Sequence, residues 1–230
     1  MIKTIDLNLK KKIPEISHLD LQIENGESYV LLGSGDRAIG HLVNIFLGLE
    51  KKYEGTVKID AFDIRTSPEV CLEHMVYLGS GNQWPQDLKI AQLLAFLKEK
   101  LDIEEDEFED FFIRSNMENL LHKKISELEE PEFRQFLFSI ARLKRNKNYI
   151  FRNFMKGMPP GVTLEFKKGI GELKEGGNSI LYLGDDVFLA PEIGDRIGFM
   201  KKGKLLLELT GTKMRKMDLK ELYFQFLVEG

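Results

Sequence analysis

The stretch from Gly33 to His41 has the layout of a phosphate-binding turn without the side chains that such a turn uses. It reads G-S-G-D-R-A-I-G-H and follows the apolar run Tyr29–Leu32. The motif G-x-x-x-x-G-K-[ST] holds phosphate with backbone N–H groups and a lysine, and its hydroxyl binds Mg²⁺. Here Ile39 stands at the lysine position and Gly40 at the hydroxyl position. The spacing therefore predicts a strand, a turn and a helix, but not the chemistry of nucleotide binding.

The composition excludes several classes of function. The 230 residues are 43% hydrophobic, enough for a buried core in one large domain or two small ones. The net charge of −4 argues against binding nucleic acid through a basic surface. No run approaches the ~20 apolar residues that span a bilayer. The single cysteine, Cys71, forms no internal disulfide, and the polar N-terminus is unlike a secretory signal, so we expect a cytoplasmic protein.

The elements that position the turn follow from periodicity. Residues 28–33 predict a buried strand, and residues 41–49 carry apolar side chains at helical spacing. Alternating residues predict further strands at 4–10, 16–23 and 55–64, and 74–81 predicts another strand. The pair Asn25-Gly26 is a strong signal for a β-hairpin.

The rest of the chain alternates between helix and strand signals. Helices are predicted in the middle of the chain at 88–101, 102–116 and 129–146. The last third predicts, in order, a strand at 148–154, a helix at 162–177, a strand at 178–186, a hairpin at 196–209 and a helix at 218–227. The chain is therefore expected to be an α/β protein.

This order of elements resembles the nucleotide-binding subunit of ATP-binding cassette (ABC) transporters. The resemblance covers nearly the whole chain and is carried by LDLQIENGESYVLLGSG, YEGTVKIDAFDI, VYLGSGNQWPQDLKIAQLLAFL, NFMKGMPPG and LKEGGNSILYLGDDVFLAPEIGDRIGFMKKGKLLLE. It implies a P-loop NTPase-like ABC ATPase fold in a single domain, residues 1–230. Residues 1–84 and 146–230 would form a core with a central, mostly parallel sheet and an antiparallel β subdomain. Residues 85–145 would form a helical subdomain.

The resemblance also places a degenerate nucleotide site on this chain. Gly40 and His41 fall on hydroxyl positions, and Ser80 falls on the glutamine-loop position. Arg152 replaces the metal-binding Walker B aspartate, Asn153 the catalytic glutamate and Asp185 the switch histidine. The whole set is Gly33, Gly35, Asp36, Arg37, Ile39, Gly40, His41, Ser80, Arg152, Asn153 and Asp185.

The signature motif, usually Leu-Ser-Gly-Gly-Gln, falls near Leu128–Glu132. Its small phosphate-facing residues are replaced by Glu129, Glu130 and Pro131, which form a degenerate signature. The two carboxylates would repel the γ-phosphate of a nucleotide bound by a partner subunit.

These substitutions predict a pseudo-ATPase. ATP hydrolysis needs a cation on the phosphates, a held Mg²⁺ and an oriented water. Ile39 removes the cation, and Gly40 and Arg152 remove the oxygen ligands of Mg²⁺. We therefore expect no catalytic residues, no metal site and no cofactor. We do not expect ATP and Mg²⁺ to bind in the usual pose, although Gly33, Gly35 and Arg37 keep features that attract an anion, because Asp36 adds a negative charge.

A compensating ion pair is a further expectation. The ends of the predicted strands should lie close together beside the turn. Arg152 is then expected to pair with Asp36, Asp185 or Asp186, because a partly buried arginine needs a charged partner.

Several readings of function stay open. The first is a structural or regulatory half of an ABC complex, as a homodimer or as a heterodimer with an active ABC ATPase subunit. It would contact a membrane permease through Ser80–Leu88 and lie at the inner face of the membrane. The alternative is a soluble scaffold or regulatory protein independent of transport. A third is an enzyme that uses Asp185, Asp186 and Arg152 for a different reaction. Trp84 would be a packing anchor or a partner contact.

Overall fold

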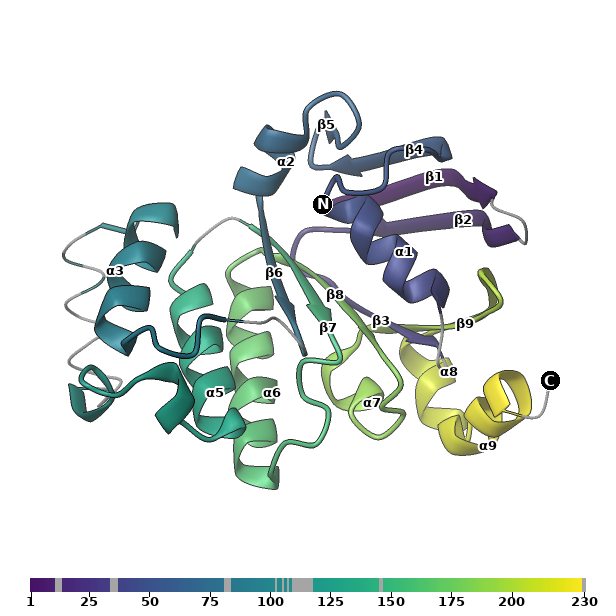
Figure 1. Ribbon diagram of the computed structural model, residues 1–230. Helices are drawn as coiled ribbons and strands as arrows, with labels where there is room; N and C mark the ends of the chain where they lie inside the picture. The colour runs from purple at the N-terminus through teal and green to yellow at the C-terminus, as the bar shows by residue number, and fades with distance from the viewer. Residues whose placement is uncertain are drawn as a thin grey trace.

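The computed structural model describes residues 1–10, 14–33, 37–80, 84–101, 103, 104, 106, 108, 118–144 and 147–228. Within this part of the chain the strands form two sheets, and the helices cover their faces (Figure 1). The predicted helix at 102–116 falls almost wholly outside the described residues.

The smaller sheet is antiparallel and has the order β2-β1-β4-β5. Its strands are β1 (Ile2–Lys10), β2 (Pro14–Ile23), β4 (Glu54–Ile59) and β5 (Phe62–Asp63). Ile2, Leu7, Leu9, Val57 and Ile59 are almost completely buried, as the alternating pattern predicts for one face of a sheet. This sheet confirms the predicted antiparallel β region.

The larger sheet carries the candidate site and has the order β10-β9-β3-β8-β7-β6. Its strands are β3 (Ser28–Gly33), β6 (Met75–Gly79), β7 (Asn148–Arg152), β8 (Ser179–Gly184), β9 (Arg196–Lys201) and β10 (Lys204–Thr210). Only the β9–β10 pair is antiparallel among these described strands. Every residue of β3 and β8 is buried, because helices cover both faces of a parallel sheet.

The predicted hairpin at Asn25-Gly26 is wrong. The two residues do form a turn, and Gly26 adopts a left-handed φ of 78°. However, β2 pairs with β1 in one sheet, whereas β3 pairs with β8 and β9 in the other. The turn therefore carries the chain between sheets. A sequence signal for a tight turn does not specify which strands pair.

Helix α1 (Arg37–Phe46) lies between the two sheets (Figure 1). Its apolar side chains share one hydrophobic cluster with residues of β1, β2, β4 and β8. The helix begins four residues before the predicted start at position 41, because the turn residue Arg37 already belongs to it. This placement fixes the end of the phosphate-like turn against the sheet.

The other face of the large sheet is covered by helices that share a second hydrophobic cluster. They include α5 (Glu130–Ala141), α6 (Pro160–Glu175) and α7 (Ala190–Ile193), and α3 (Ile90–Leu101) joins the same cluster from beyond α5 (Figure 1). The remaining helices of the described residues are α2 (Pro68–Glu73), η1 (Glu118–Leu120), η2 (Ile125–Glu127), α8 (Gly211–Lys216), α9 (Leu219–Tyr223) and the π-helix η3 (Phe224–Val228). In Figure 1, α5 and α6 stand side by side, and α8 and α9 lie beside the last strands.

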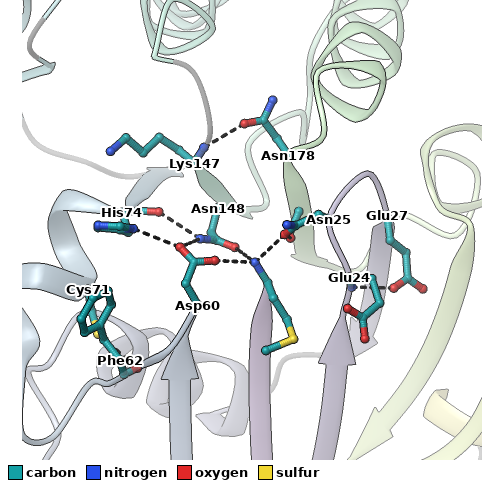
Figure 2. A network of polar contacts seen from close by, with 12 residues as sticks. Glu24, Asn25, Glu27, Asp60, Phe62, Cys71, His74, Lys147, Asn148 and Asn178 are labelled. Carbon is teal, nitrogen blue, oxygen red and sulfur yellow. Dashed lines mark hydrogen bonds and ion pairs between the residues drawn. The ribbon is translucent and has the colours of Figure 1, made fainter.

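A polar network joins the two sheets (Figure 2). The α-amino group of Met1 donates to Asp60 Oδ1 at 2.7 Å, Asn25 Oδ1 at 2.8 Å and Asn148 Oδ1 at 2.7 Å. Asp60 follows β4, whereas Asn148 begins β7 of the other sheet. His74 lies 3.1 Å from Asp60 Oδ2, and Asn148 donates to the same oxygen at 3.1 Å. The network therefore links the small sheet to the large one through one carboxylate.

Candidate functional site

The candidate site lies where β3, β6, β7 and β8 end. These strands are parallel, so their carboxyl ends meet at one edge of the sheet, which is where such sheets bind ligands. Arg152 pairs in register with Gly79 of β6 and Leu183 of β8. The N–H of Ser80 donates to the carbonyl of Arg152 at 2.9 Å. The structure thus brings Ser80, Arg152, Asn153 and Asp185 to one edge, as expected.

Ile39 occupies the lysine position as a core residue. Its side chain is 5% exposed and belongs to the hydrophobic cluster around α1. It packs directly against Gly33, since a Cβ atom at Gly33 would lie only 3.1 Å from Ile39 Cγ1. The side chain therefore points into the protein, away from any ligand in the turn.

Arg152 lies over the start of α1, at the position that lacks a side chain. Its Nη2 atom is 3.5 Å from where a Cβ atom of Gly40 would be. Burial raises the pKa of Tyr77, and the charge of Arg152 and a hydrogen bond from it oppose that rise. The guanidinium is thus held between Gly40 and Tyr77. A Cβ atom at position 40 would therefore lie at ordinary contact distance from this large side chain.

The predicted pairing of Arg152 with Asp185 or Asp186 is wrong. Asp185 Oδ2 instead accepts from Lys156 Nζ at 2.6 Å, and this bond raises the pKa of Lys156. Asp186 Oδ1 accepts the N–H groups of Phe188 and Leu189, both at 3.0 Å, and so caps the turn that leads into α7. Both carboxylates therefore have closer partners. Asp36 and Gly35 lie outside the described residues.

Asn153, which the resemblance places at the position of a catalytic carboxylate, has a strained backbone. Its φ of 48° lies in the left-handed region, which asparagine tolerates better than most residues. Its N–H donates to the carbonyl of Leu183 at 2.8 Å. Its Oδ1 lies 2.9 Å from where a Cβ atom of Gly184 would be, so the amide packs against β8. The residue joins two strand ends and offers no general base.

The degenerate signature forms the first turn of α5. Glu129 is the residue before the helix and is exposed, and Pro131 occupies the first turn, where a proline needs no N–H partner. Glu130 turns along the helix to Arg134, with which it forms a salt bridge. The two glutamates therefore differ in role, which the motif alone did not show.

The other described candidate residues have separate contacts and do not point toward a common ligand position. Arg37 begins α1 and is exposed, and His41 Nδ1 lies 3.9 Å from Glu50 Oε2. Trp84 packs edge-on against Phe133, with 6.2 Å between ring centroids, which confirms the packing role. Within the described residues, no group of three or more His, Cys, Asp or Glu side chains could hold a metal ion.

An open groove of about 400 Å³ adjoins the site, and the sequence did not indicate it. It is lined by Lys156, Gly157, Asp185, Asp186, Val187, Phe188, Lys220, Tyr223 and Phe224. Burial and the nearby charge of Asp185 raise the pKa of Tyr223. The ammonium of Lys220 lies 4.6 Å from the centre of the Phe188 ring. The groove forms because the C-terminal helices pack beside the end of β8, a long-range contact that no local motif encodes.

The two sheets around α1, together with the strand-end site, define the fold of the ATP-binding subunits of ABC transporters. A solved structure titled "Structure of ATP binding subunit of ABC transporter" matches with a TM-score of 0.86 and 17% identity, covering 98% of this chain and 99% of that one. CbiO1 from Clostridium perfringens, described as part of the ABC transporter complex cbiONQ, matches with a TM-score of 0.78 and 19% identity, covering 99% and 95%. MJ0796, described as a dimeric bacterial ABC transporter cassette, matches with a TM-score of 0.77 and 17% identity, covering 91% and 98%.

A sequence relative points the same way. The chain is 23% identical over 207 residues to the uncharacterized ABC transporter ATP-binding protein YdbJ of Bacillus subtilis (strain 168), covering 88% of this chain and 67% of that protein. No family model matches the chain. The relative and the solved structures confirm the resemblance to ABC ATP-binding subunits and the predicted fold class. Within the described residues, no helix is long and apolar enough to cross a membrane.

Proposed function

We propose that the chain is an ABC ATP-binding-type subunit that neither binds Mg-ATP in the usual pose nor hydrolyses it, and that serves as a structural or regulatory half of an ABC complex. The observation that carries this proposal is the guanidinium of Arg152 beside Gly40. An intact site would place a carboxylate and a hydroxyl there, as oxygen ligands for Mg²⁺. This chain places a fixed positive charge at the same point, which repels a metal ion and offers it no oxygen.

The phosphate side of the site supports the same proposal. Phosphoryl transfer depends almost entirely on positioning and on stabilising the charge of the phosphates. Ile39 is buried against Gly33 and contributes no charge to this region. Asn153 carries an amide, which does not accept a proton from water at neutral pH. The site therefore lacks the metal ligands, the phosphate lysine and the base together.

The partners belong to the same proposal. The chain pairs with a second copy or with an intact ABC ATPase subunit, as the dimeric MJ0796 cassette suggests for this fold. It contacts a membrane permease through Ser80–Leu88, of which residues 80 and 84–88 are described. Through that permease it lies at the inner face of the membrane, in the cytoplasm.

A soluble scaffold independent of transport is the second candidate. The exposed Glu129 before α5 favours it, because a carboxylate at the signature position repels the γ-phosphate of a partner's nucleotide. This repulsion disfavours a closed dimer in which the helix start faces a nucleotide. The exposed Glu129 does not hinder the binding of a protein that carries no phosphate at this surface.

Calorimetric titration of the purified chain with Mg-ATP, beside an intact ABC ATPase, tests the first part of the proposal. We expect no heat of binding and no rise in melting temperature at millimolar ATP, since a bound ligand stabilises the folded state by mass action. Binding by the chain would overturn the proposal. The Arg152→Ala variant, tested in parallel, would then show whether the arginine had replaced the missing lysine.

Affinity isolation of the tagged chain from mildly solubilised native membranes separates the two candidates. Recovery with an intact ABC ATPase subunit and a membrane protein of several spans supports the transporter half. Recovery only from the soluble fraction, without either protein, supports the scaffold. A variant with Gln86→Ala and Asp87→Ala, two exposed positions, gives a control for contact through Ser80–Leu88.

A further inference from the structure

Arg134 is a buried arginine that reaches from α5 to another part of the fold. Only 8% of its surface is exposed to solvent. Its Nη1 atom donates to the carbonyl of Phe154 at 2.5 Å and to the carbonyl of Lys156 at 3.2 Å. Its Nη2 atom donates to Glu130 Oε1. The guanidinium thus connects the first turn of α5 with the loop at 153–159, which runs from β7 to α6.

These contacts are needed to hold the arginine in place. An ionised side chain taken out of water is costly unless it is paired and hydrogen-bonded. Glu130 supplies the opposite charge, and the two carbonyls satisfy further N–H groups. The geometry can form only when the loop keeps both carbonyls turned toward α5. The buried charge therefore selects one loop conformation and one position of α5.

The same loop is held from its other side. Lys156 Nζ donates to Asp185 Oδ2 at 2.6 Å, and Asp185 directly follows β8. The loop's own N–H groups complete the arrangement, since that of Lys156 donates to the Asn153 carbonyl at 3.1 Å and that of Met158 to the Met155 carbonyl at 3.1 Å. The path from Glu130 to Asp185 runs through the Arg134 guanidinium, the backbone carbonyl of Lys156 and the ammonium of Lys156.

We propose that Glu130, Arg134, Lys156 and Asp185 form a clamp that fixes α5, the loop at 153–159 and the end of β8 in one arrangement without a nucleotide. The clamp deepens the proposed function, because it gives the substituted signature and switch positions a structural role. Glu130 and Asp185 stand where the resemblance places residues that act on nucleotide. In this chain each one instead has a basic partner from the same chain.

Apolar contacts also join α5 to the loop, so the test must separate the two effects. Phe138 of α5 lies 6.3 Å, between ring centroids, from Phe154. These contacts remain when the charged groups are changed, and they keep the variants folded. Conservative substitutions are therefore suited to the test.

Hydrogen exchange measured by mass spectrometry on the full chain, without ATP, tests the clamp. Arg134→Lys keeps the charge but cannot reach Glu130 and both carbonyls together. We expect exchange in peptides covering 153–158 to rise by about tenfold, because hydrogen bonds to a charged group are lost there. Peptides from β1 and β2 should exchange as in the wild type. Unchanged exchange at 153–158, or an equal rise in β1 and β2, would overturn the clamp.

Matched variants give the controls. Glu130→Gln removes the same charge as Glu129→Gln one residue away, but only the first should raise exchange in the loop. Lys156→Gln should act as Glu130→Gln does, whereas Lys167→Gln, which breaks an ion pair with Glu192 at 2.9 Å, should leave the loop unchanged. Equal effects within either pair would reject the proposal. ATP is absent throughout, so binding of ATP in the calorimetric test would overturn the proposed function without deciding the clamp.

Discussion

At the scale of single residues, the site differs in side-chain size and charge from the nucleotide site that the resemblance implies. A large cation, Arg152, lies beside a glycine, and the apolar Ile39 fills the place of a cation. Gly33 leaves room for the isoleucine, because a Cβ atom there would lie only 3.1 Å from Ile39 Cγ1, and Arg152 lies within contact distance of Gly40. Restoring one catalytic side chain alone should therefore disturb the packing.

Replacing Ile39 by lysine tests this directly. We expect Ile39→Lys to lower the free energy of unfolding by about 2–4 kcal/mol, because it buries an ammonium in an apolar cluster. Urea denaturation followed by circular dichroism gives the value. Ile39→Leu keeps the volume and should cost less than about 1.5 kcal/mol. A lysine variant as stable as the leucine variant would show that residue 39 reaches solvent.

At the scale of elements, the packing of α6 on α5 forms the helical layer beneath the strand ends of the site. Helix α6 packs on α5 where Gly169 faces Phe138, and a Cβ atom at Gly169 would lie 2.4 Å from Phe138 Cε1. Phe138 in turn contacts Phe166 of α6, with 4.7 Å between ring centroids. The absent side chain at residue 169 thus allows an aromatic cluster to form under the strand ends.

Two glycines of α6 give a matched pair for this contact. Gly169→Ala should destabilise the protein by about 1–3 kcal/mol, because the added methyl overlaps the Phe138 ring. Gly171→Ala adds the same methyl where no atom lies within 4 Å, so it should stabilise the helix by about 0.5–1 kcal/mol. Thermal unfolding of both variants measures the difference. The same sign for both changes would contradict the packing of α5 on α6.

At the scale of the whole molecule, the two sheets are joined by the network around Asp60 (Figure 2). Burial of this carboxyl tends to raise its pKa. Hydrogen bonds from the α-amino group of Met1, from Asn148 and from His74 outweigh burial, and they hold the pKa of Asp60 below its ordinary value of 3.8. The ionised carboxylate is therefore favoured in the folded state.

The sign of the pH dependence follows from this lowered pKa. The contribution of Asp60 to stability is present above its ordinary pKa of 3.8 and is lost as the pH falls through the lower, folded-state pKa. Asp60→Asn should lower stability at neutral pH by about 0.5–1 kcal/mol, a value suited to a partly exposed pair. Asparagine tolerates the left-handed φ of 55° at this position, so the change removes the charge and one acceptor oxygen without straining the backbone.

Melting curves of both proteins from neutral to acid pH measure the effect. The two curves should converge in acid, where the wild-type carboxyl is protonated. Asp87→Asn is the control, since Asp87 is 96% exposed in its pair with Lys124. A difference for Asp60→Asn that stays constant down to acid pH would assign the effect to shape instead of charge.

The sequence by itself determined the fold and the composition of the site. Periodicity identified the strands that end at Gly33, Gly79, Arg152 and Gly184, because a buried parallel strand needs a continuous apolar run. Read through the resemblance, the spacing of Ile39, Gly40, Arg152 and Asn153 predicts that the side chains needed for ATP hydrolysis are replaced. These features depend on residues that are close together in the chain, so the amino-acid sequence alone contains them.

Only the tertiary structure decided which groups pair. The sequence suggested Arg152 with Asp36, Asp185 or Asp186, but Asp185 binds Lys156 and Asp186 accepts backbone N–H groups, while Arg152 lies between Gly40 and Tyr77. It also suggested a hairpin at a turn that crosses between sheets. The contact of Glu130 with Arg134 has helical spacing and could have been read from the sequence, whereas the reach of Arg134 to the carbonyls of the loop could not. Pairing depends on distances between segments far apart in the chain, and the packing of α5, α6 and the strand ends sets those distances.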